Sequence, residues 1–218
     1  MEDYTLIETP EALQQFYEAH KDLEWMGFDT EFVGEKRYQT RLCLIQTISE
    51  RGLYLIDPIK LKEQLKPFLL LIEDHRIEKI THAGDNDYRL LYNLYGTLPS
   101  NVFDTQIVGG FVGYRYPTSF RKLVEGELGK RLKKGYAVAD WEARPLKEKP
   151  IKYALDDVIP LPGMWKSLKK KLKARGREHW AEEELKLLEQ EAFYYKDPHH
   201  EALNSNLMRN LNTKEKAF

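Results

Sequence analysis

The chain has 218 residues, and its 34 Lys and Arg against 35 Asp and Glu give a formal net charge of -1. Hydrophobic residues make up 42% and charged residues 32%, which is typical of a globular protein and excludes a disordered tail. The longest strongly apolar stretch, residues 68–72, is far shorter than the roughly 20 residues of a membrane-spanning helix. The length predicts one domain with a tail or a small second unit.

Cysteine usage and the first residues indicate a cellular compartment. Cys43 is the only cysteine, so one chain can form neither a disulfide framework nor a cysteine zinc cluster, and a reducing compartment fits. The acidic start, Met1-Glu2-Asp3-Tyr4, lacks the basic and apolar regions of a secretory signal. We therefore expect a cytoplasmic protein.

Positive charge is concentrated in the second half of the chain. Residues 115–177 hold 18 Lys and Arg and 7 Asp and Glu, a local net charge of +11, so the rest of the chain carries −12. Such a stripe suits a polyanion, because each neutralised phosphate releases counterions. A solvated helix face is the plain alternative for any single lysine run. The separation of charge favours a nucleic-acid partner over that alternative.

The first 110 residues alternate between strand and helix patterns, which predicts an α/β sheet with helical connections. Residues 10–20 are a predicted helix, with Thr9 as its N-cap and Pro10 at its first position. Three predicted strands follow in close succession, at residues 25–32, 42–49 and 52–56. Their spacing predicts an antiparallel meander.

The alternation continues in the middle of the chain. Residues 61–74 are a predicted helix, residues 78–82 a short strand, and residues 85–95 a helix that ends at Gly96. Beyond Asp104 the pattern is helical, and two prolines at positions 145 and 150 then mark a loop that ends before residue 151.

The C-terminal part is predicted to be helical as far as a polar tail. Residues 151–175 form one predicted long helix, with a kink at Pro160 and Pro162. A charged amphipathic helix follows over residues 178–195, and the Asp-Pro pair at positions 197–198 ends it. The remaining residues hold too few apolar side chains to make a core.

Two carboxylates stand two positions apart in the first predicted strand, where residues 28–32 are Phe-Asp-Thr-Glu-Phe. The period of a strand puts Asp29 and Glu31 on one face and Thr30 on the other, together with both phenylalanines. Neighbouring carboxylates on an apolar strand are costly unless they are paired, and a divalent cation is the usual partner. The same Asp-x-Glu spacing at residues 22–24 and 140–142 lies in polar surroundings, which indicates surface charge there.

Two further groups of acids lie where helices are predicted. Asp85 and Asp87 follow a strand and begin a helix, so either could cap it; we favour capping for Asp85 and a ligand role for Asp87. Tyr153 and Asp157 are i and i+4 on a helix and share one face. Tyr136 and its own i+4 aspartate have the same spacing, but they lack a helical pattern.

Taken in chain order, these segments resemble the three exonuclease motifs of the DnaQ-like (DEDD) superfamily, in its tyrosine-bearing RNase D branch. The resemblance spans residue 4 to about residue 175. The sister branch has a histidine where this chain has Lys152, which excludes that branch. The motifs that carry the resemblance are Asp29-Thr30-Glu31-Phe32, Leu44-Ile45-Gln46, Leu55-Ile56-Asp57-Pro58, His82-Ala83-Gly84 with Asp87, Asp104-Thr105-Gln106, Asp140-Trp141, Arg144-Pro145-Leu146, and Tyr153-Ala154 with Asp157-Val158.

The resemblance implies a ribonuclease H-like mixed β-sheet with flanking helices, followed by a helical tail. It implies a 3′-5′ exonuclease in which Tyr153 positions the attacking water as a neutral phenol, since the reference pKa of tyrosine is about 10. The cofactors would be two divalent cations, Mg²⁺ or Mn²⁺, which activate water and stabilise the leaving 3′ oxygen. The metal-binding carboxylates would be Asp29, Glu31, Asp87 and Asp157.

The implied substrate is the 3′ end of a single-stranded nucleic acid, with RNA favoured and 5′-mononucleotides as products. Asp104 suits a helix N-cap better than a metal ligand. Substrate contacts are expected from Thr30, from Phe32 or Tyr38 by base stacking, and from the His82-Ala83-Gly84 segment. DNA ends or very short oligonucleotides remain alternative substrates. A non-catalytic nucleic-acid binding module is the alternative of another class, and it is disfavoured because all five catalytic side chains are present.

The resemblance also implies a division of the chain. Residues 1–175 would be the catalytic domain, and residues 176–218 a C-terminal helix and polar tail similar to the approach to the helical accessory (HRDC-type) domain of RNase D proteins. Either this is part of a longer protein or the lineage has a minimal form. Departures from the family pattern bear on substrate preference more than on catalysis, and they are Ala139, Pro150, Pro160 and Pro162.

Overall fold

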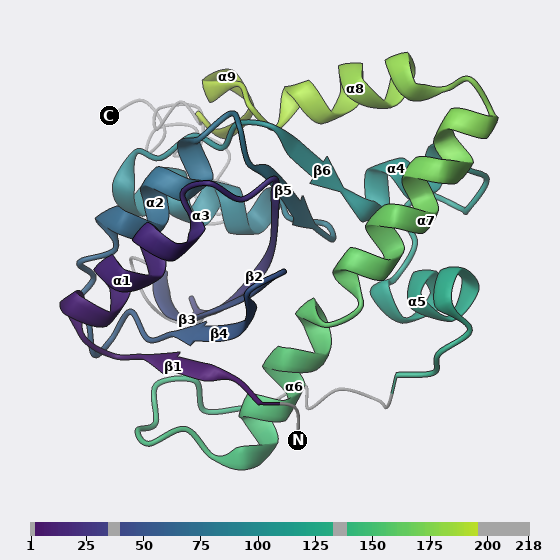
Figure 1. Cartoon of the computed structure of the whole chain (residues 1–218). Helices are drawn as coiled ribbons and strands as arrows, with labels where there is room; N and C mark the ends of the chain where they lie inside the picture. The colour runs from purple at the N-terminus through teal and green to yellow at the C-terminus, as the bar shows by residue number, and fades with distance from the viewer. Residues whose placement is uncertain (1–2, 35–39, 133–138, 196–218) are drawn as a thin grey trace, which may run out of the picture.

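A computed structural model describes residues 3–34, 40–132 and 139–195 of the chain. Six strands form one mixed sheet in the order β1-β4-β3-β2-β5-β6, which confirms the predicted fold class (Figure 1). Strands β2, β3 and β4 pair antiparallel, whereas β1, β5 and β6 join the sheet by parallel pairing. The strands are β1 Thr5–Ile7, β2 Trp25–Val33, β3 Arg41–Ser49, β4 Gly52–Ile56, β5 Glu78–Thr81 and β6 Val102–Asp104.

Helices cover both faces of the sheet, and each face has its own hydrophobic core. On one face, α1, α2 and α3 pack around residues such as Phe28 and Phe68. On the other face, α4 to α7 pack around residues such as Leu44 and Leu168. The helices are α1 Pro10–His20, α2 Lys66–Glu73, α3 Asp85–Tyr95, α4 Thr105–Phe111, α5 Phe120–Leu128, α6 Glu148–Val158, α7 Leu161–Ala174, α8 Glu178–Leu187 and α9 Glu191–Tyr194.

Local chemistry explains the elements that the sequence predicts well. The Thr9 hydroxyl accepts a hydrogen bond from the Ala12 N–H, as expected of the N-cap of α1. Helix α3 ends at Gly96, whose φ of 70° is the left-handed conformation of a C-cap. The antiparallel meander of β2, β3 and β4 is confirmed, and the predicted strand bounds differ by at most one residue.

Three predicted helices are wrong in their extent. The helix expected over residues 61–74 begins only at Lys66, because Lys62 and Glu63 adopt positive φ angles that interrupt a helix. The single helix over residues 151–175 is two helices, since Pro160 stands between α6 and α7. Helix α6 also begins earlier, with Pro150 in its first turn, where a missing N–H is tolerated. The helix over residues 178–195 is likewise two helices, α8 and α9.

The two edge strands, β1 and β6, lie outside the predicted elements. Each has three residues, which is too short for a period of two to stand out in the sequence. Within the described residues, no helix is both long enough and apolar enough to cross a membrane.

Arg144 fastens the segment before α6 to the sheet. Its Nη2 donates to the Asp57 carboxylate at 2.9 Å and to the Cys43 carbonyl at 2.7 Å, and Nε also donates to Asp57. The Asp57 side chain is only 1% exposed. This buried ion pair links the segment before α6 to the ends of β3 and β4, so we assign Arg144 a structural role.

We expect Arg144→Met to lower the free energy of unfolding by about 3–5 kcal/mol, because the substitution leaves a buried carboxylate without its partner. Arg41→Met is the matched control, since the Arg41 ion pair with Glu142 is more exposed and should contribute less than about 1 kcal/mol. Urea unfolding of both variants measures the difference. Equal small losses would contradict the structural importance of Arg144.

Candidate active site

Strand β2 presents its two carboxylates to a cavity beneath α6. Asp29 lies directly opposite Gln46 in the antiparallel pairing with β3, and the Gln46 amide donates to Asp29 Oδ2 at 3.1 Å. A register shift follows at once, since Glu31 pairs with Leu44 and Phe32 pairs with Leu42. The expected alternation therefore holds across Asp29 and Glu31 and is disturbed immediately after them.

Three of the four predicted metal ligands lie together. Carboxylate oxygens of Asp29, Glu31 and Asp157 are within 4.8 Å of one another, although the residues come from a strand and a helix far apart in sequence. They border a cavity of about 270 Å³ between the sheet, helix α6 and the first residues of α5 and α7. The cavity is lined by Phe28, Asp29, Thr30, Glu31, His82, Phe120, Tyr153, Asp157 and Leu161.

Asp87 approaches this group from the opposite face of the sheet. It is buried in the first turn of α3, and the Thr30 hydroxyl donates to its Oδ1. Its charge raises the pKa of Glu31, after the larger effects of burial and Asp157, so the fourth carboxylate is electrically part of the cluster. The capping role favoured for Asp85 is wrong, because the N-cap of α3 is Gly84 and no side chain caps this end.

The four carboxylates resist ionisation together. Burial raises the pKa of Asp29 well above its ordinary value, and the charges of the other three carboxylates add to this effect. Burial together with neighbouring carboxylates raises the pKa of Glu31 to about 8. Burial raises the pKa of Asp157 to about 7 against a hydrogen bond from Tyr153, and the pKa of Asp87 to about 7 against that from Thr30.

This donor set fits divalent cations of the Mg²⁺ type, which prefer oxygen ligands. Within residues 3–34, 40–132 and 139–195, no lysine or arginine forms an ion pair with any of the four carboxylates. Buried like charges without a cationic side chain are costly, and a bound cation removes the cost. The residues that could hold such ions are Asp29, Glu31, Asp87 and Asp157.

Tyr153 lies one helical turn before Asp157 on the same face of α6, and both line the cavity. Burial raises the pKa of Tyr153 above its ordinary value, and the charges of Asp157 and Glu31 raise it further. The phenol is therefore neutral at pH 7 and acts as a hydrogen-bond donor. The Tyr153 ring packs beside the Trp141 ring, with 6.3 Å between the two ring centroids.

The turn from β5 into α3 is held in a strained conformation by Asp104. Ala83 has a φ of 54°, and a Cβ on Gly84 would lie 2.6 Å from the Thr81 hydroxyl, so only glycine fits there. Asp104 accepts from the Gly84 N–H at 2.8 Å, and it also caps α4, as the sequence predicts. This aspartate thus positions the turn and lies outside the carboxylate cluster.

His82 is placed at the edge of the cavity by two contacts. Its Nδ1 lies 2.9 Å from the Thr105 hydroxyl, which itself donates to the Thr81 carbonyl. The ring meets the Phe120 ring edge to face at 5.1 Å.

Neither of the two residues predicted to stack on a base, Phe32 and Tyr38, is among the described residues that line the cavity. Phe32 is 40% exposed and lies beyond the register shift, outside the lining of the cavity, and Tyr38 lies outside the described residues. Sequence reasoning missed Gln46 and Phe120 as site residues. Gln46 stands in a motif of the resemblance directly opposite Asp29, so strand pairing could have identified it, whereas only the fold brings Phe120 to the cavity.

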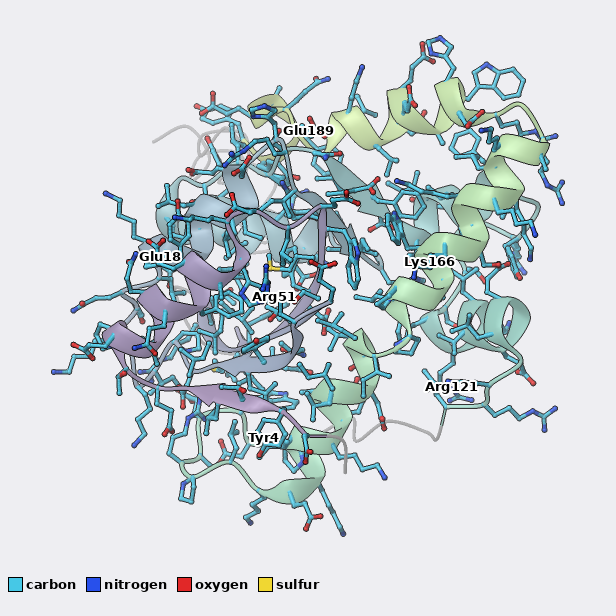
Figure 2. All side chains as sticks on the ribbon, in the orientation of Figure 1. Tyr4, Glu18, Arg51, Arg121, Lys166 and Glu189 are labelled. Carbon is cyan, nitrogen blue, oxygen red and sulfur yellow. The ribbon has the colours of Figure 1, made fainter. Side chains whose placement is uncertain are left out.

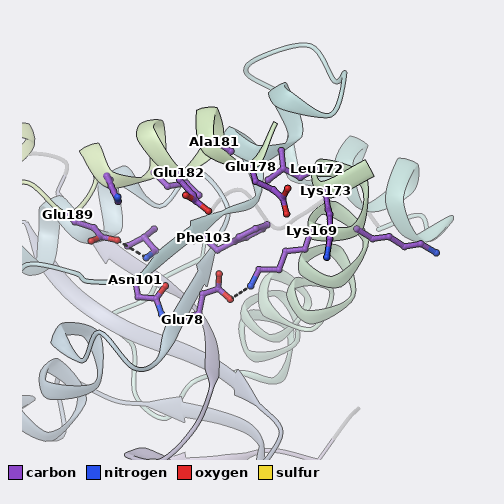
Figure 3. A pocket seen from close by; sticks show the side chains of 14 residues that line it. Glu78, Asn101, Phe103, Lys169, Leu172, Lys173, Glu178, Ala181, Glu182 and Glu189 are labelled. Atoms are coloured by element: carbon purple, nitrogen blue, oxygen red, sulfur yellow. Dashed lines mark hydrogen bonds and ion pairs between the residues drawn. The ribbon is translucent and has the colours of Figure 1, made fainter. Parts of the chain in front are cut away.

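Part of the basic region lies away from the acidic side chains of α1, and part lies beside acidic side chains of α8 (Figure 2). In Figure 2, Arg121 of α5 and Lys166 of α7 lie on one side of the molecule and Glu18 of α1 on the other. Part of the positive charge is used internally, as Figure 3 shows for a cavity of about 610 Å³ at the far end of β5 and β6. There, Lys169 Nζ contacts Glu78 at 2.6 Å and so fixes α7 to the sheet.

Comparisons with known proteins agree with this geometry. A family model described as 3′-5′ exonuclease matches residues 4–173. Ribonuclease D of Bartonella henselae is 39% identical over 168 residues, which cover 77% of this chain and 41% of that protein. The chain spans about half the length of the curated relatives it matches.

Solved structures show the same fold. The crystal structure of Escherichia coli RNase D, an exoribonuclease involved in structured RNA processing, superposes with a TM-score of 0.87 and 31% identity over 98% of this chain and 57% of that one. Brucella melitensis NrnC bound to pGG superposes with a TM-score of 0.72 and 25% identity, over 85% of this chain and 90% of that one. The chain therefore belongs to the 3′-5′ exonuclease family, in its ribonuclease D-like branch.

Proposed function

We propose that this protein is a metal-dependent 3′-5′ exoribonuclease that removes 5′-mononucleotides from the 3′ end of single-stranded RNA. The observation that carries the proposal is the grouping of Asp29, Glu31 and Asp157 around one cavity, with Tyr153 beside them. The ribonuclease D relatives support RNA as the substrate class. The catalytic unit is residues 1–175, in which all these groups lie.

Each side chain has a distinct task in this mechanism. Divalent cations at such a site activate water and stabilise charge on the leaving oxygen, and Asp29, Glu31, Asp87 and Asp157 would hold them. In the structure the Tyr153 phenol donates its one proton to Asp157; with Asp157 holding a cation, that proton would turn to the attacking water and aim it at the terminal phosphodiester. Thr30 and Gln46 hold Asp87 and Asp29 in place from the sheet. Phe120 and His82 form the wall against which the 3′ nucleotide lies.

Tyr153→Phe should lower kcat by about 10- to 100-fold and leave KM nearly unchanged, because the variant loses the hydrogen bond to the water and keeps the carboxylates. The matched control is Tyr92→Phe, which removes a hydroxyl that donates to Glu191 at 2.7 Å, away from the cavity. Steady-state kinetics on a short RNA measure both variants. A loss as large as that of a metal-ligand variant would contradict a role limited to positioning.

The decisive experiment follows the products formed from a 5′-labelled single-stranded RNA in Mg²⁺, in Mn²⁺ and in EDTA. We expect a ladder that shortens one nucleotide at a time from the 3′ end with either metal, and intact RNA in EDTA. Binding without cleavage in all three conditions would instead indicate a nucleic-acid binding module.

Very short oligonucleotides are a second candidate substrate class. The favouring observation is the NrnC structure bound to pGG, together with the small volume of the carboxylate cavity, about 270 Å³. Matched RNA, DNA and dinucleotide substrates distinguish the possibilities through their kcat/KM values. A kcat/KM for the dinucleotide that is higher than that for every longer RNA would make this second candidate the main function.

A further inference from the structure

A second cavity lies on the other side of the turn that places His82. His82 lines the carboxylate cavity, whereas its chain neighbour Ala83 and also Asp85 line the second one. We call this second cavity the Tyr116 pocket; it has a volume of about 550 Å³ and is bordered by α4, by the segment from Phe111 to Tyr116, and by α8 and α9. Consecutive Cα atoms are about 3.8 Å apart, so a single turn of chain separates the two cavities.

The walls of the Tyr116 pocket suit a flat, uncharged group. Four of its lining residues are aromatic, namely Phe111, Tyr114, Tyr116 and Phe193. Among the described residues that line it, none is a lysine or arginine, so a phosphate finds no cationic partner inside. The volume lies within the range of about 300–1,000 Å³ that is common for small-molecule sites. A nucleobase, which has an aromatic face and no charge, meets these conditions.

The two tyrosines differ in how they are held. The Tyr114 hydroxyl donates to Glu127 at 2.6 Å, and its ring packs so tightly on Gly126 that no Cβ would fit there. Tyr114 is thus a fixed part of the wall. Tyr116 packs on Gly110 through its Cβ, yet it remains 62% exposed. An exposed ring beside a fixed aromatic wall provides a stacking surface for a base.

Positive charge stands outside the pocket, along the segment that carries both tyrosines. The Arg175 guanidinium lies 3.8 Å from the position that a Cβ would take on Gly113, and Arg115 is exposed next to Tyr116. Aromatic walls inside and guanidinium groups outside match a nucleotide whose base enters while its phosphate stays at the surface.

We propose that the Tyr116 pocket binds one base of the single-stranded substrate, upstream of the scissile bond, while the 3′ nucleotide occupies the carboxylate cavity. The proposal rests on the proposed exonuclease function and extends it to a second subsite. Three carboxylates line the pocket. Asp104 already accepts from backbone N–H groups, whereas Asp85 and Glu184 can accept from a base, so they favour bases with an exocyclic amino group, such as cytosine or adenine, over uracil.

The test is an abasic scan with the full chain in Mn²⁺. A series of 5′-labelled hexanucleotide RNAs carries one abasic site each, at successive positions from the 3′ end. In the wild-type protein, we expect one upstream position at which the abasic site raises KM about 5- to 100-fold, the range of base–aromatic stacking. The kcat for the unmodified hexanucleotide at saturating concentration serves as the internal measure of the exonuclease itself.

Three variants identify the pocket as the origin of that effect. Tyr116→Ala removes the stacking ring, and Gly110→Leu fills the pocket beside that ring without removing a polar group. Trp180→Ala is the matched control, because this aromatic side chain of α8 is 57% exposed and does not line the pocket. The position-specific penalty should disappear in the first two variants and persist in the third, with kcat for the unmodified hexanucleotide unchanged in all.

Two outcomes would overturn the second subsite. One is an abasic penalty of the same size in Tyr116→Ala and in Gly110→Leu as in the wild type. The other is the lack of any position-specific penalty in the wild type. A wild-type protein that leaves the unmodified hexanucleotide intact in Mn²⁺ would instead contradict the proposed exonuclease function, so the two failures can be told apart.

Discussion

Asp157→Asn is expected to lower the rate of RNA hydrolysis by roughly 10³-fold or more, while the protein stays folded. Asp157 is the carboxylate that α6 adds to the pair on β2, and its oxygen lies within 4.8 Å of theirs. An amide keeps the size of the side chain but cannot balance the charge of a cation. The substitution therefore removes a metal ligand with little change in packing.

The fold should tolerate this change because the folded protein already disfavours the ionised form of this group. Burial raises the pKa of Asp157 to about 7, so a neutral amide at this position adds no electrostatic strain. Thermal unfolding in EDTA is expected at the wild-type temperature or slightly above it. An unfolded variant would leave the activity loss without a mechanistic meaning, and the melting curve reports this directly.

The control is the same substitution one residue earlier on the same helix. Asp156 does not line the cavity, so Asp156→Asn should retain most of the wild-type rate. Single-turnover cleavage of a 3′-labelled RNA compares the two variants under identical metal concentrations. Near wild-type turnover by Asp157→Asn, or equal losses in both variants, would contradict the assignment of Asp157 as a metal ligand.

Much of the site could be predicted where the relevant geometry is local. The period of a strand places Asp29 and Glu31 on one face, and the pitch of a helix places Tyr153 and Asp157 on one face. Both relations depend only on the element in which the residues lie. The meeting of the two pairs in one cavity came from the family resemblance, and the structure shows the same grouping for three of the four carboxylates.

Features that depend on pairing between distant segments could not be predicted. The contact of Thr30 with Asp87 crosses from β2 to α3, and the register shift after Glu31 depends on how β3 lies beside β2. The Tyr116 pocket likewise needs α8 packed against α4. A predicted helix bound is wrong where a residue adopts a positive φ angle, as at Lys62. This residue is neither glycine nor asparagine, so the sequence does not indicate the interruption.

The near-zero net charge of the chain hides two opposite requirements of a nuclease that uses metal ions. The carboxylates must be close together and poorly solvated to hold cations, and the substrate needs positive charge outside that cavity. In the folded molecule three of the carboxylates group around one cavity, Lys169 pairs with Glu78, and Arg121 and Lys166 lie on the side of the molecule away from Glu18 (Figure 2). The exposed remainder of the basic region is thus the part that can contact phosphates, and its contribution should weaken as salt rises.

Glu31→Gln should stabilise the metal-free protein and abolish its response to Mn²⁺. The pKa of Glu31 is raised to about 8 by burial and then by Asp157 and Asp87, against an ordinary value of about 4.3. Between these values the folded protein holds more protons than the unfolded chain, so the free energy of unfolding falls as pH rises from about 4 to about 8. The variant lacks this titration. Its free energy of unfolding should therefore fall by about 1–3 kcal/mol less than that of the wild type across the same pH interval.

Metal binding should show the opposite dependence on pH, because a cation must displace these protons before it binds. In the wild type, Mn²⁺ should therefore raise the unfolding temperature more at about pH 8 than at about pH 6, and Glu31→Gln should lose most of this gain together with its RNA hydrolysis. Glu50→Gln, in the exposed turn between β3 and β4, is the matched control and should behave as the wild type. In this account, Glu31 both destabilises the metal-free protein and binds the ion. A Glu31→Gln variant that lost its Mn²⁺ response but gained no stability in EDTA would contradict the electrostatic explanation of the carboxylate cluster.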